Sequence, residues 1–484
     1  MTLRDLASIL PATIVAGWAC LLLLIDLFIP RGRKGWTAFL TAVGLVAALG
    51  ALLGSPLGSS PSGFGGMVAA DGFAVFFQAV FLLSGLLVVP LTFDYLRRQG
   101  IERGEYYVLL MFSLSGMMLM AQAGDLAIVF LSLELLSLPL YVMAGIARPR
   151  ADSEESAMKY FLLGAFASAL LVYGIALAYG ATGSTRLDAI LQSFASGQAN
   201  PRLLVIGSAL ILTGLGFKVA AVPFHMWTPD VYHGAPSAAA AFMSVGAKAA
   251  GFSALLRVFL AGFPGLSPFW GPAAMAISAA TMAWGNVAAI AQPNIKRMLA
   301  YSSIAHAGYI LMALAASASA GVAASATASA AFYLLAYAVT NLGAWAVVIT
   351  LEGPEGRGLT IDEYAGLSRR RPGVALAMTI FMLSLTGVPP TVGFLAKFYL
   401  FRAVLDAGLI WLALVGVVTS LVSAYYYLRV VVVMYMRPGE PDTRSEAWLN
   451  TTVAVTAMAT LVLGLLPGPA LALAERASLL ALSP

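Results

Sequence analysis

The chain has 484 residues, of which 60% are hydrophobic and only 10% are charged, and its formal net charge is +5. Soluble domains carry about 25% charged residues, so this composition excludes a soluble globular protein and indicates an integral membrane protein. The basic residues lie in short loops between apolar runs, which favours a membrane-topology signal over a nucleic-acid-binding surface.

Apolar runs long enough to span a membrane follow one another along nearly the whole chain. A spanning helix needs about 20 apolar residues, and about fourteen runs come close to this length. The first is too long for a secretory signal peptide, and the single cysteine within it, Cys20, excludes a disulfide or an iron–sulfur cluster built by this chain alone. The runs predict an all-α integral membrane protein with a single transmembrane domain over residues 1–484. They occupy residues 8–29, 36–54, 72–96, 106–123, 125–147, 156–181, 203–230, 236–262, 268–290, 294–316, 323–351, 372–405, 408–436 and 449–475.

The seventh and twelfth runs are too long for one plain helix, and both contain helix-breaking residues near the centre. Pro223 lies in the seventh, and Gly387, Pro389, Pro390 and Gly393 lie in the twelfth. Proline removes a backbone donor and clashes with the preceding turn. Broken helices persist in membranes only where protein or water satisfies the freed backbone groups. Both runs are therefore predicted to be broken helices.

Two broken helices five runs apart predict an internal repeat. Runs four to eight (106–262) and runs nine to thirteen (268–436) would be the two copies, preceded by three helices in 1–105 and followed by one in 449–484. Because each copy has an odd number of helices, the second would be inverted relative to the first. Inverted repeats with broken helices are typical of transporters.

The distribution of lysine and arginine over the loops predicts the orientation. Loops after odd-numbered runs hold sixteen of these residues: Arg31, Arg33, Lys34, Arg97, Arg98, Arg103, Arg148, Arg150, Lys296, Arg297, Arg357, Arg369, Arg370, Arg371, Arg437 and Arg444. The other side holds five: Arg4, Arg186, Arg202, Arg402 and Arg476. The loops after odd-numbered runs are therefore predicted to be cytoplasmic, with both termini on the opposite, periplasmic side.

Four charged residues interrupt the apolar runs: Glu134, Lys218, Lys248 and Lys397. A charge at the bilayer centre costs a few kcal/mol or more, and such residues often mark an ion or proton route. At about 1.5 Å of rise per residue, Glu134 and Lys248 lie about 13.5 and 15 Å into their runs, near the middle of a core about 30 Å thick.

Burial disfavours the charged form of a lysine, whereas a nearby carboxylate favours it. A lysine under both influences can gain and lose a proton, as a proton relay requires. The alternative is a static Glu–Lys pair that holds helices together. Three lysines, two of them in broken helices, favour transport. By contrast, Asp26 and Arg257 lie near helix ends, where long side chains can extend to the interface, and Glu155 and Lys159 have the spacing of an interfacial pair.

Several uncharged polar residues could extend such a relay. His225 follows the break in run seven, and His306 in run ten could link Lys248 to Lys397, because histidine titrates near neutral pH. Tyr337 and Asn341 are four residues apart in run eleven and share a helix face. For these two, helix packing by hydrogen bonds and a relay role remain open alternatives.

Three segments resemble the antiporter-like subunits of respiratory complex I. They are LSLELLSLPLYV around Glu134, GFKVAAVPFHMWTPDVYHGAPS from Gly216 to Ser237, and GFLAKF ending at Phe398. The TPDVY and GAP motifs, together with a lysine at position 397, most resemble the N-type branch of NADH-quinone oxidoreductase subunits. Mrp-type cation/proton antiporter subunits share much of the pattern.

The resemblance implies a role for each charge. Glu134 matches a glutamate that modulates a lysine in broken helix seven, Lys218 matches that lysine, Lys248 a central lysine, and Lys397 a proton-exit residue. His306 falls where a polar linker is expected. His233 departs from the family pattern, in which an acidic or amide residue is expected.

The resemblance also implies the setting: a proton-translocating subunit of NADH-quinone oxidoreductase in a bacterial inner membrane. Flavin, iron–sulfur clusters and quinone would belong to partner subunits, with no cofactor or metal in this chain. Its partners would be M-type and small K-, J- and A-type membrane subunits, the lipid bilayer and protons, with no nucleic acid. An Mrp-type cation/proton antiporter subunit is the main alternative, and a membrane anchor without an ion path is another.

Overall fold

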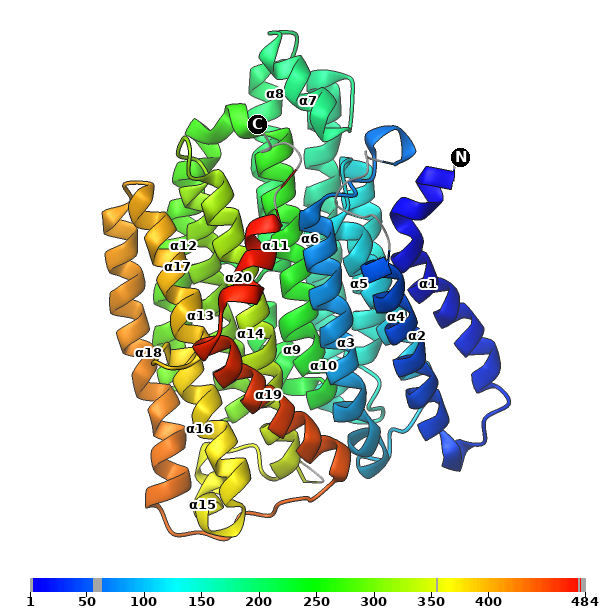
Figure 1. Cartoon of the computed structure of the whole chain (residues 1–484), viewed down its shortest axis with the longest axis vertical. Helices are drawn as coiled ribbons and strands as arrows, with labels where there is room; N and C mark the ends of the chain where they lie inside the picture. The colour runs from blue at the N-terminus through cyan, green and yellow to red at the C-terminus, as the bar shows by residue number, and fades with distance from the viewer. Residues whose placement is uncertain (1–2, 55–62, 354–355, 478, 480–484) are drawn as a thin grey trace.

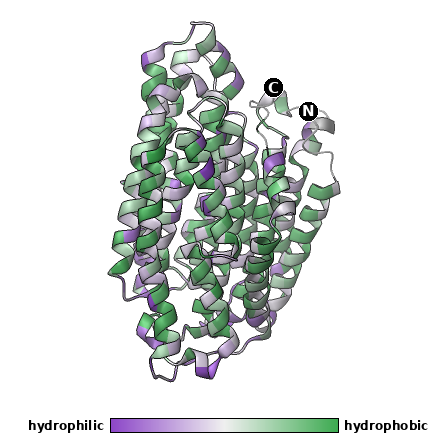
Figure 2. Ribbon diagram, turned by 60° about the vertical axis from the view of Figure 1, so that its left-hand side comes forward, coloured by the Kyte–Doolittle hydropathy of each residue, from purple (hydrophilic) through white to green (hydrophobic). Residues whose placement is uncertain are grey.

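The computed structural model describes residues 3–54, 63–353, 356–477 and 479, and the extreme ends of the chain lie outside these ranges. The described residues form helices and a few isolated β-bridges, with no β-strand among them. This confirms the predicted all-α class. Hydrophobic residues dominate the middle of the helices, and hydrophilic residues gather mainly at the two ends of the bundle (Figure 2).

Most of the predicted runs correspond to single helices. They are α1 (Leu3–Asp26), α2 (Gly35–Gly54), α3 (Gly72–Arg98), α4 (Glu105–Ala121), α5 (Leu126–Ala144), α6 (Ala151–Thr182), α12 (Ser267–Ile290), α13 (Ile295–Ala316), α14 (Ala323–Leu351) and α18 (Ile410–Met436). The fourteenth run begins with α19 (Ala447–Leu465). Twelve of the described helices are long and apolar enough to cross a membrane, while Glu105–Ala121 and Pro372–Thr386 are apolar but shorter. The predicted count of about fourteen is therefore close.

Runs seven and twelve are broken where the prolines predict. The seventh forms α8 (Pro201–Lys218) and α9 (Trp227–Gly234), and the twelfth forms α16 (Pro372–Thr386) and α17 (Val392–Asp406). Both first halves end in left-handed backbone, with φ of 61° at Ala220 and 93° at Gly387. Neither break leaves its helix end without partners, because Ala221 N–H donates to the carbonyl of Gly216 and Val388 N–H donates to that of Leu383.

Three features of the helices were not predicted. The eighth run is α10 (Ser237–Phe242) and α11 (Lys248–Arg257), interrupted by π-helical turns at Met243–Ala247 and Val258–Gly262. A short helix, α7 (Leu187–Ala195), follows α6, and Pro467 separates α19 from α20 (Gly468–Arg476). The widened turns of run eight cannot be read from hydropathy, because the residues that form them, Met243–Ala247 and Val258–Gly262, carry no charge and no proline that would mark an irregular turn.

The loops gather at two ends of the bundle, as alternating spans require. Loops after even-numbered runs meet one another through isolated bridges between Val68 and Ala123 and between Asp125 and Arg186. At the other end, Asn294 bridges to Thr360, and both belong to loops after odd-numbered runs. In Figure 1 the first residues of α1 and the short helix α7 lie toward the same upper end of the bundle, and α19 crosses the front obliquely.

Glycines let the long helices approach closely. A Cβ added at Gly174 of α6 would lie 2.7 Å from the carbonyl oxygen of Gly207 on α8, and one at Gly308 of α13 would lie 2.5 Å from the amide nitrogen of Met282 on α12. Small residues at helix interfaces are the usual basis of packing in membranes, where lipid provides no hydrophobic drive between helices.

The expectation that Arg257 extends to the interface is wrong. Its guanidinium is 4% exposed and forms two hydrogen bonds of 2.8 and 2.7 Å with the carboxylate of Asp71, which caps α3. It also donates to the carbonyl of Ala121 at 2.8 Å and lies 4.9 Å from the ring centre of Phe73. Asp26 is likewise buried, bonded to Lys34 and Thr37. Partners on other helices satisfy these charges, which sequence spacing alone does not reveal.

Removing one member of the Asp71–Arg257 pair is expected to destabilise the protein strongly. The Arg257→Met variant removes the guanidinium and its two hydrogen bonds from the buried carboxylate of Asp71, and breaking such a pair costs about 3–5 kcal/mol. Adding Asp71→Asn removes that charge while an amide oxygen keeps the cap of α3, so the double variant should recover most of the loss. Thermal unfolding of the detergent-solubilised protein measures both, and equal midpoints for single and double variants would contradict this account.

Residues 356–364, which follow α14, contain a capping box formed by Thr360 and Glu363. The Glu363 carboxylate accepts hydrogen bonds from the amide nitrogens of Gly358 (2.9 Å) and Thr360 (2.8 Å) and from the Thr360 hydroxyl (2.6 Å). Burial alone raises the pKa of Glu363, but these hydrogen bonds outweigh it and leave the pKa below its usual value. The contribution to stability is therefore present above the unfolded pKa and is lost as the pH falls through the folded value.

Amide hydrogen exchange should report this titration. In the wild type, protection of the Gly358 and Thr360 amides is expected to fall as the pH drops from the usual glutamate pKa through the lower pKa of the folded protein, after correction for intrinsic exchange rates. Glutamine at a capping-box position can still accept the Thr360 bonds through its one amide oxygen, and it does not titrate, so Glu363→Gln should show no such transition at the Thr360 amide. A transition of equal size in both variants would place its origin elsewhere.

Candidate functional site

Glu134 and Lys218 lie around one face of α5 without touching each other. Glu134 is half-buried and accepts a 2.6 Å hydrogen bond from Ser168 on α6. Lys218, the last residue of α8, is 4% exposed, and its ammonium donates to the Ser137 hydroxyl (2.8 Å) and the Tyr160 hydroxyl (3.1 Å). Among the described residues, no ion pair within 4.0 Å joins the two charges; Ser137, one turn after Glu134, separates them.

Lys248 occupies the first turn of α11, directly after a π-helical turn, and is 2% exposed. Its ammonium donates a 2.5 Å hydrogen bond to the carbonyl of Ser303 on α13. Lys218 lies close to the same helix, because a Cβ added at Gly251 would be 3.5 Å from the Cβ and Cγ of Lys218. The glycine thus lets the stem of the first lysine pack one turn away from the second.

Lys397 lies on α17 and reaches back across the break of run twelve. Its ammonium donates to the carbonyl of Thr386 (2.8 Å), the last residue of α16, and to the Ser420 hydroxyl (2.7 Å) on α18. Carbonyls in the last turn of a helix have no partner within that helix, so the break supplies the acceptor. Gly387 is required beside it: its φ is 93°, and an added Cβ would lie 2.9 Å from the Cδ of Lys397.

One face of α13 connects Lys248 with Lys397. Ser303 provides the carbonyl that binds Lys248, and Lys397 Nζ lies 4.9 Å from the ring centre of Tyr309. His306 lies between them and is 4% exposed. These three positions are each three residues apart, so they share a helix face and span about 9 Å along it.

Tyrosines surround His306 on all its polar edges. Its Nδ1 lies 2.7 Å from the Tyr333 hydroxyl, and its Nε2 lies 3.1 Å from the Tyr427 hydroxyl. The Tyr337 ring packs against it with centroids 5.0 Å apart. A cavity of about 10 Å³ beside it is lined by His306, Tyr337, Thr340 and Ser384 together with apolar residues, and its volume is about the space one water needs.

The two polar residues predicted on run eleven lie beside this centre. Asn341 donates a 2.7 Å hydrogen bond to Ser244, one turn before Lys248. The Tyr337 hydroxyl forms no hydrogen bond of normal geometry with the described residues. The structure therefore brings Lys248, His306, Tyr337, Asn341 and Lys397 together across α11, α13, α14 and α17.

His225 is not brought into hydrogen-bond contact with the four charges. It lies in the turn between α8 and α9, and its ring centre is 6.1 Å from that of Trp284 on α12. Its relay role stays a prediction.

Sequence reasoning missed the residues that hold the charges in place. Hydroxyl and carbonyl partners such as Ser137, Tyr160, Ser303 and Ser420 are too common to single out. Lys296 could have been recognised as a charge within the tenth apolar run, but it stands next to Arg297, and the loop-charge pattern assigns both residues to a loop. The structure buries it, 2% exposed, with its ammonium 2.7 Å from the Ala235 carbonyl.

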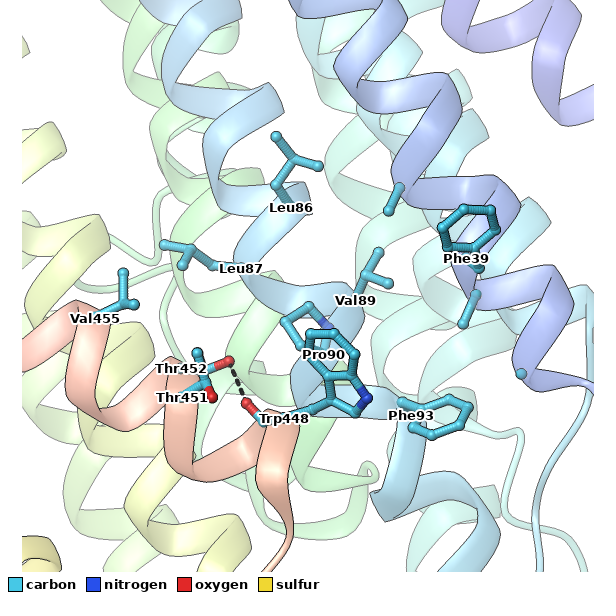
Figure 3. Close-up of a pocket in the computed structure, with 13 residues that line it drawn as sticks. Phe39, Leu86, Leu87, Val89, Pro90, Phe93, Trp448, Thr451, Thr452 and Val455 are labelled. Atoms are coloured by element: carbon cyan, nitrogen blue, oxygen red, sulfur yellow. Dashed lines mark hydrogen bonds between the residues drawn. The ribbon is translucent and has the colours of Figure 1, made fainter.

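Larger clefts lie away from the polar face of α13. One of about 400 Å³ is formed by α2, α3 and α19 (Figure 3). Its lining is apolar apart from Thr451 and Thr452, and the Thr452 hydroxyl already donates to the carbonyl of Trp448 at 3.0 Å. Such a cleft offers no group that could hold or transfer a proton.

Comparisons with known proteins agree with the resemblance seen in the sequence. The family described as NADH:quinone oxidoreductase/Mrp antiporter, transmembrane, matches residues 123–423. A protein named NADH-quinone oxidoreductase subunit N from Chloroflexus aggregans is 50% identical over 479 residues, covering 98% of this chain and 97% of that protein. One of the same name from Trichlorobacter lovleyi is 46% identical over 481 residues, covering 98% and 97%.

Solved structures give the same result. A chain of respiratory complex I from Thermus thermophilus is 38% identical, with a TM-score of 0.82 and coverage of 96% of this chain and 99% of that one. A chain of an Mrp complex from Dietzia is 22% identical, with a TM-score of 0.84 and coverage of 99% and 97%; at that identity it shows the fold alone. The chain belongs to the NADH:quinone oxidoreductase/Mrp antiporter family of membrane proteins.

Proposed function

We propose that this chain is a proton-translocating membrane subunit of an NADH-quinone oxidoreductase, and that Glu134, Lys218, Lys248 and Lys397 carry its protons. The observation that supports this most directly is the continuous polar face of α13. It holds the Lys248 ammonium at one position and lies beside the Lys397 ammonium two turns later, with a buried histidine between them.

Each charge has a distinct part in the proposed path. When Glu134 and Lys218 approach each other, the carboxylate stabilises the protonated form of Lys218. When they separate, Lys218 releases its proton more readily, toward the hydroxyls of Ser137 and Tyr160. A proton on Lys248 faces His306 across one helical turn of α13. Lys397 receives it at the second break and is the exit residue. Each elementary charge moved against 100 mV takes about 2.3 kcal/mol, so the steps need energy from redox chemistry.

The supporting assembly completes the proposal. Flavin, iron–sulfur clusters and quinone would be held by partner subunits, and M-type and small K-, J- and A-type membrane subunits would be neighbours. The chain would lie in a bacterial inner membrane with both termini periplasmic. The segments 106–262 and 268–436 would act as two inverted halves, each with one broken helix, flanked by 1–105 and 449–484.

An Mrp-type cation/proton antiporter subunit is the second candidate, since the fold is shared. The relatives named subunit N are far more similar, at 50% and 46% identity against 22% for the Mrp chain, which favours the first candidate. A membrane anchor without an ion path would leave the buried lysines without a function.

Proteoliposomes containing the whole complex test the proposal. NADH oxidation should drive proton translocation in the wild type, and Lys218→Met should lower the number of protons moved per NADH. Lys159→Met is the matched control, because that lysine is 40% exposed and pairs with Glu155 and Asp230 at the edge of α6. Unchanged proton yield in Lys218→Met would contradict the proposed path, and Na⁺ exchange by the isolated chain would favour the antiporter.

A further inference from the structure

One face of α14, continued by its C-cap residue Glu352, carries a line of buried polar groups that the proposed relay uses only at its upper end. Tyr337, Asn341, Trp345 and Glu352 follow at spacings of four, four and seven residues. At 100° per residue these positions fall within about 80° of one another. All four are buried, with exposures of 3%, 0%, 0% and 1%.

Each of these side chains has a polar atom without a hydrogen bond of normal geometry to the described residues. These atoms are the Tyr337 hydroxyl, the Asn341 carbonyl oxygen, the Trp345 indole nitrogen and one carboxylate oxygen of Glu352. An unsatisfied buried polar atom is destabilising, and lipid cannot satisfy it. Buried water is the usual partner of such atoms. Four of them on one face indicate a hydrated line along α14.

The lower end of this face is a buried carboxylate among ionisable groups. Glu352 accepts a 3.2 Å hydrogen bond from the Tyr95 hydroxyl, which itself accepts from the amide of Ser237, the first residue of α10. Lys296 and Tyr364 lie within electrostatic range of Glu352. These residues belong to the end of the bundle that the loop charges assign to the cytoplasm.

The upper end reaches the neighbours of Lys248. Asn341 binds Ser244, four residues before Lys248, and Tyr337 packs on His306. Fifteen residues separate Glu352 from Tyr337, which is about 22 Å of helix. The face therefore runs from the cytoplasmic end of the bundle to the middle of the proposed relay.

We propose that Glu352 is the cytoplasmic proton-uptake residue for Lys248, and that the hydrated face of α14 conducts the proton from it through Asn341 and Tyr337. The step is a proton transfer only: the carboxylate takes a proton from the cytoplasmic side and releases it to water along the face. This inference rests on the proposed function, since Lys248 must accept the proton.

Two substitutions separate proton uptake from a static anchor. Glu352→Gln keeps an acceptor for the Tyr95 hydroxyl but cannot take up a proton, so proton translocation in proteoliposomes should fall about tenfold. Tyr95→Phe removes the hydrogen bond and keeps the carboxylate, so translocation should fall less than threefold. A static anchor requires the reverse order, and normal pumping by Glu352→Gln, or equal loss in both, would overturn the proposal.

Two further measurements keep the test interpretable. Native electrophoresis should show assembled complex for each variant, and Glu352→Asp should restore pumping in part because it restores a carboxylate. Lowering the pH on the cytoplasmic side should raise the residual rate of Glu352→Gln, since proton supply then limits it, and should not help Lys248→Met. If Lys248→Met itself pumps normally, the proposed function fails; if only Glu352→Gln does, the uptake proposal alone fails.

Discussion

The Lys248→Met variant is expected to lose proton translocation by about tenfold or more in proteoliposomes of the whole complex. Methionine keeps most of the stem volume at a site that is 2% exposed, so packing around α11 should survive. What it removes is the ammonium that donates to the Ser303 carbonyl. Without a group that holds a proton there, the charge would have to cross the membrane centre unassisted, and each 1.4 kcal/mol added to the barrier slows the step tenfold.

The measurement is the initial rate of proton uptake per NADH oxidised, with Lys159→Met as the control at an exposed lysine. Lys248→Arg is informative beside it, because arginine keeps a charge but does not release its proton in proteins. It should therefore fail to restore pumping. Wild-type proton yield in Lys248→Met would remove the central residue from the path.

The second large effect is expected at the link between the lysines. In His306→Leu an apolar side chain of similar length replaces the imidazole, so the hydroxyls of Tyr333 and Tyr427 lose their contact with the ring nitrogens. A positioned proton donor and acceptor typically contributes 10²–10⁴-fold to a proton-transfer rate. We expect at least about a tenfold fall in proton translocation.

His233→Leu is the matched control, since His233 lies on α9 and is half-buried outside the polar face of α13. Its activity should stay near that of the wild type. His306→Gln keeps a hydrogen-bonding side chain that does not titrate, so pumping in this variant would show that hydration, and not the imidazole, carries the proton. Equal losses in His306→Leu and His233→Leu would contradict a specific link.

Hydropathy and proline positions were sufficient for the membrane class, the approximate number of spans and both broken helices. Those features depend on local composition, which the sequence states directly. The partner of a side chain on another helix cannot be predicted in this way, because it depends on how the helices pack. Arg257 looked like a residue at a helix end, and only the arrangement of α3 against α11 shows that Asp71 neutralises it. Lys296 looked like a loop charge because Asn294 and Arg297 flank it, yet α13 begins there and buries it.

For the site, too, the charged residues could be predicted from the sequence and their partners could not. The four charges stand out because lipid tolerates so few of them. The direct pairing of Glu134 with Lys218 is not what the structure shows, because Ser137 takes the ammonium. The unpartnered atoms on α14 belong to ordinary helix residues, and their meaning depends on which neighbouring groups fail to reach them.

The single helix α13 that contacts both Lys248 and Lys397 has a mechanical consequence. A rigid rod touched near two separate points behaves as a lever: if it tilts about its middle, one contact tightens while the other loosens. The two lysines would then be out of phase, with the passage toward one side of the membrane interrupted whenever the other is connected. A pump needs such alternation, because two simultaneously connected halves would let protons flow back down their gradient.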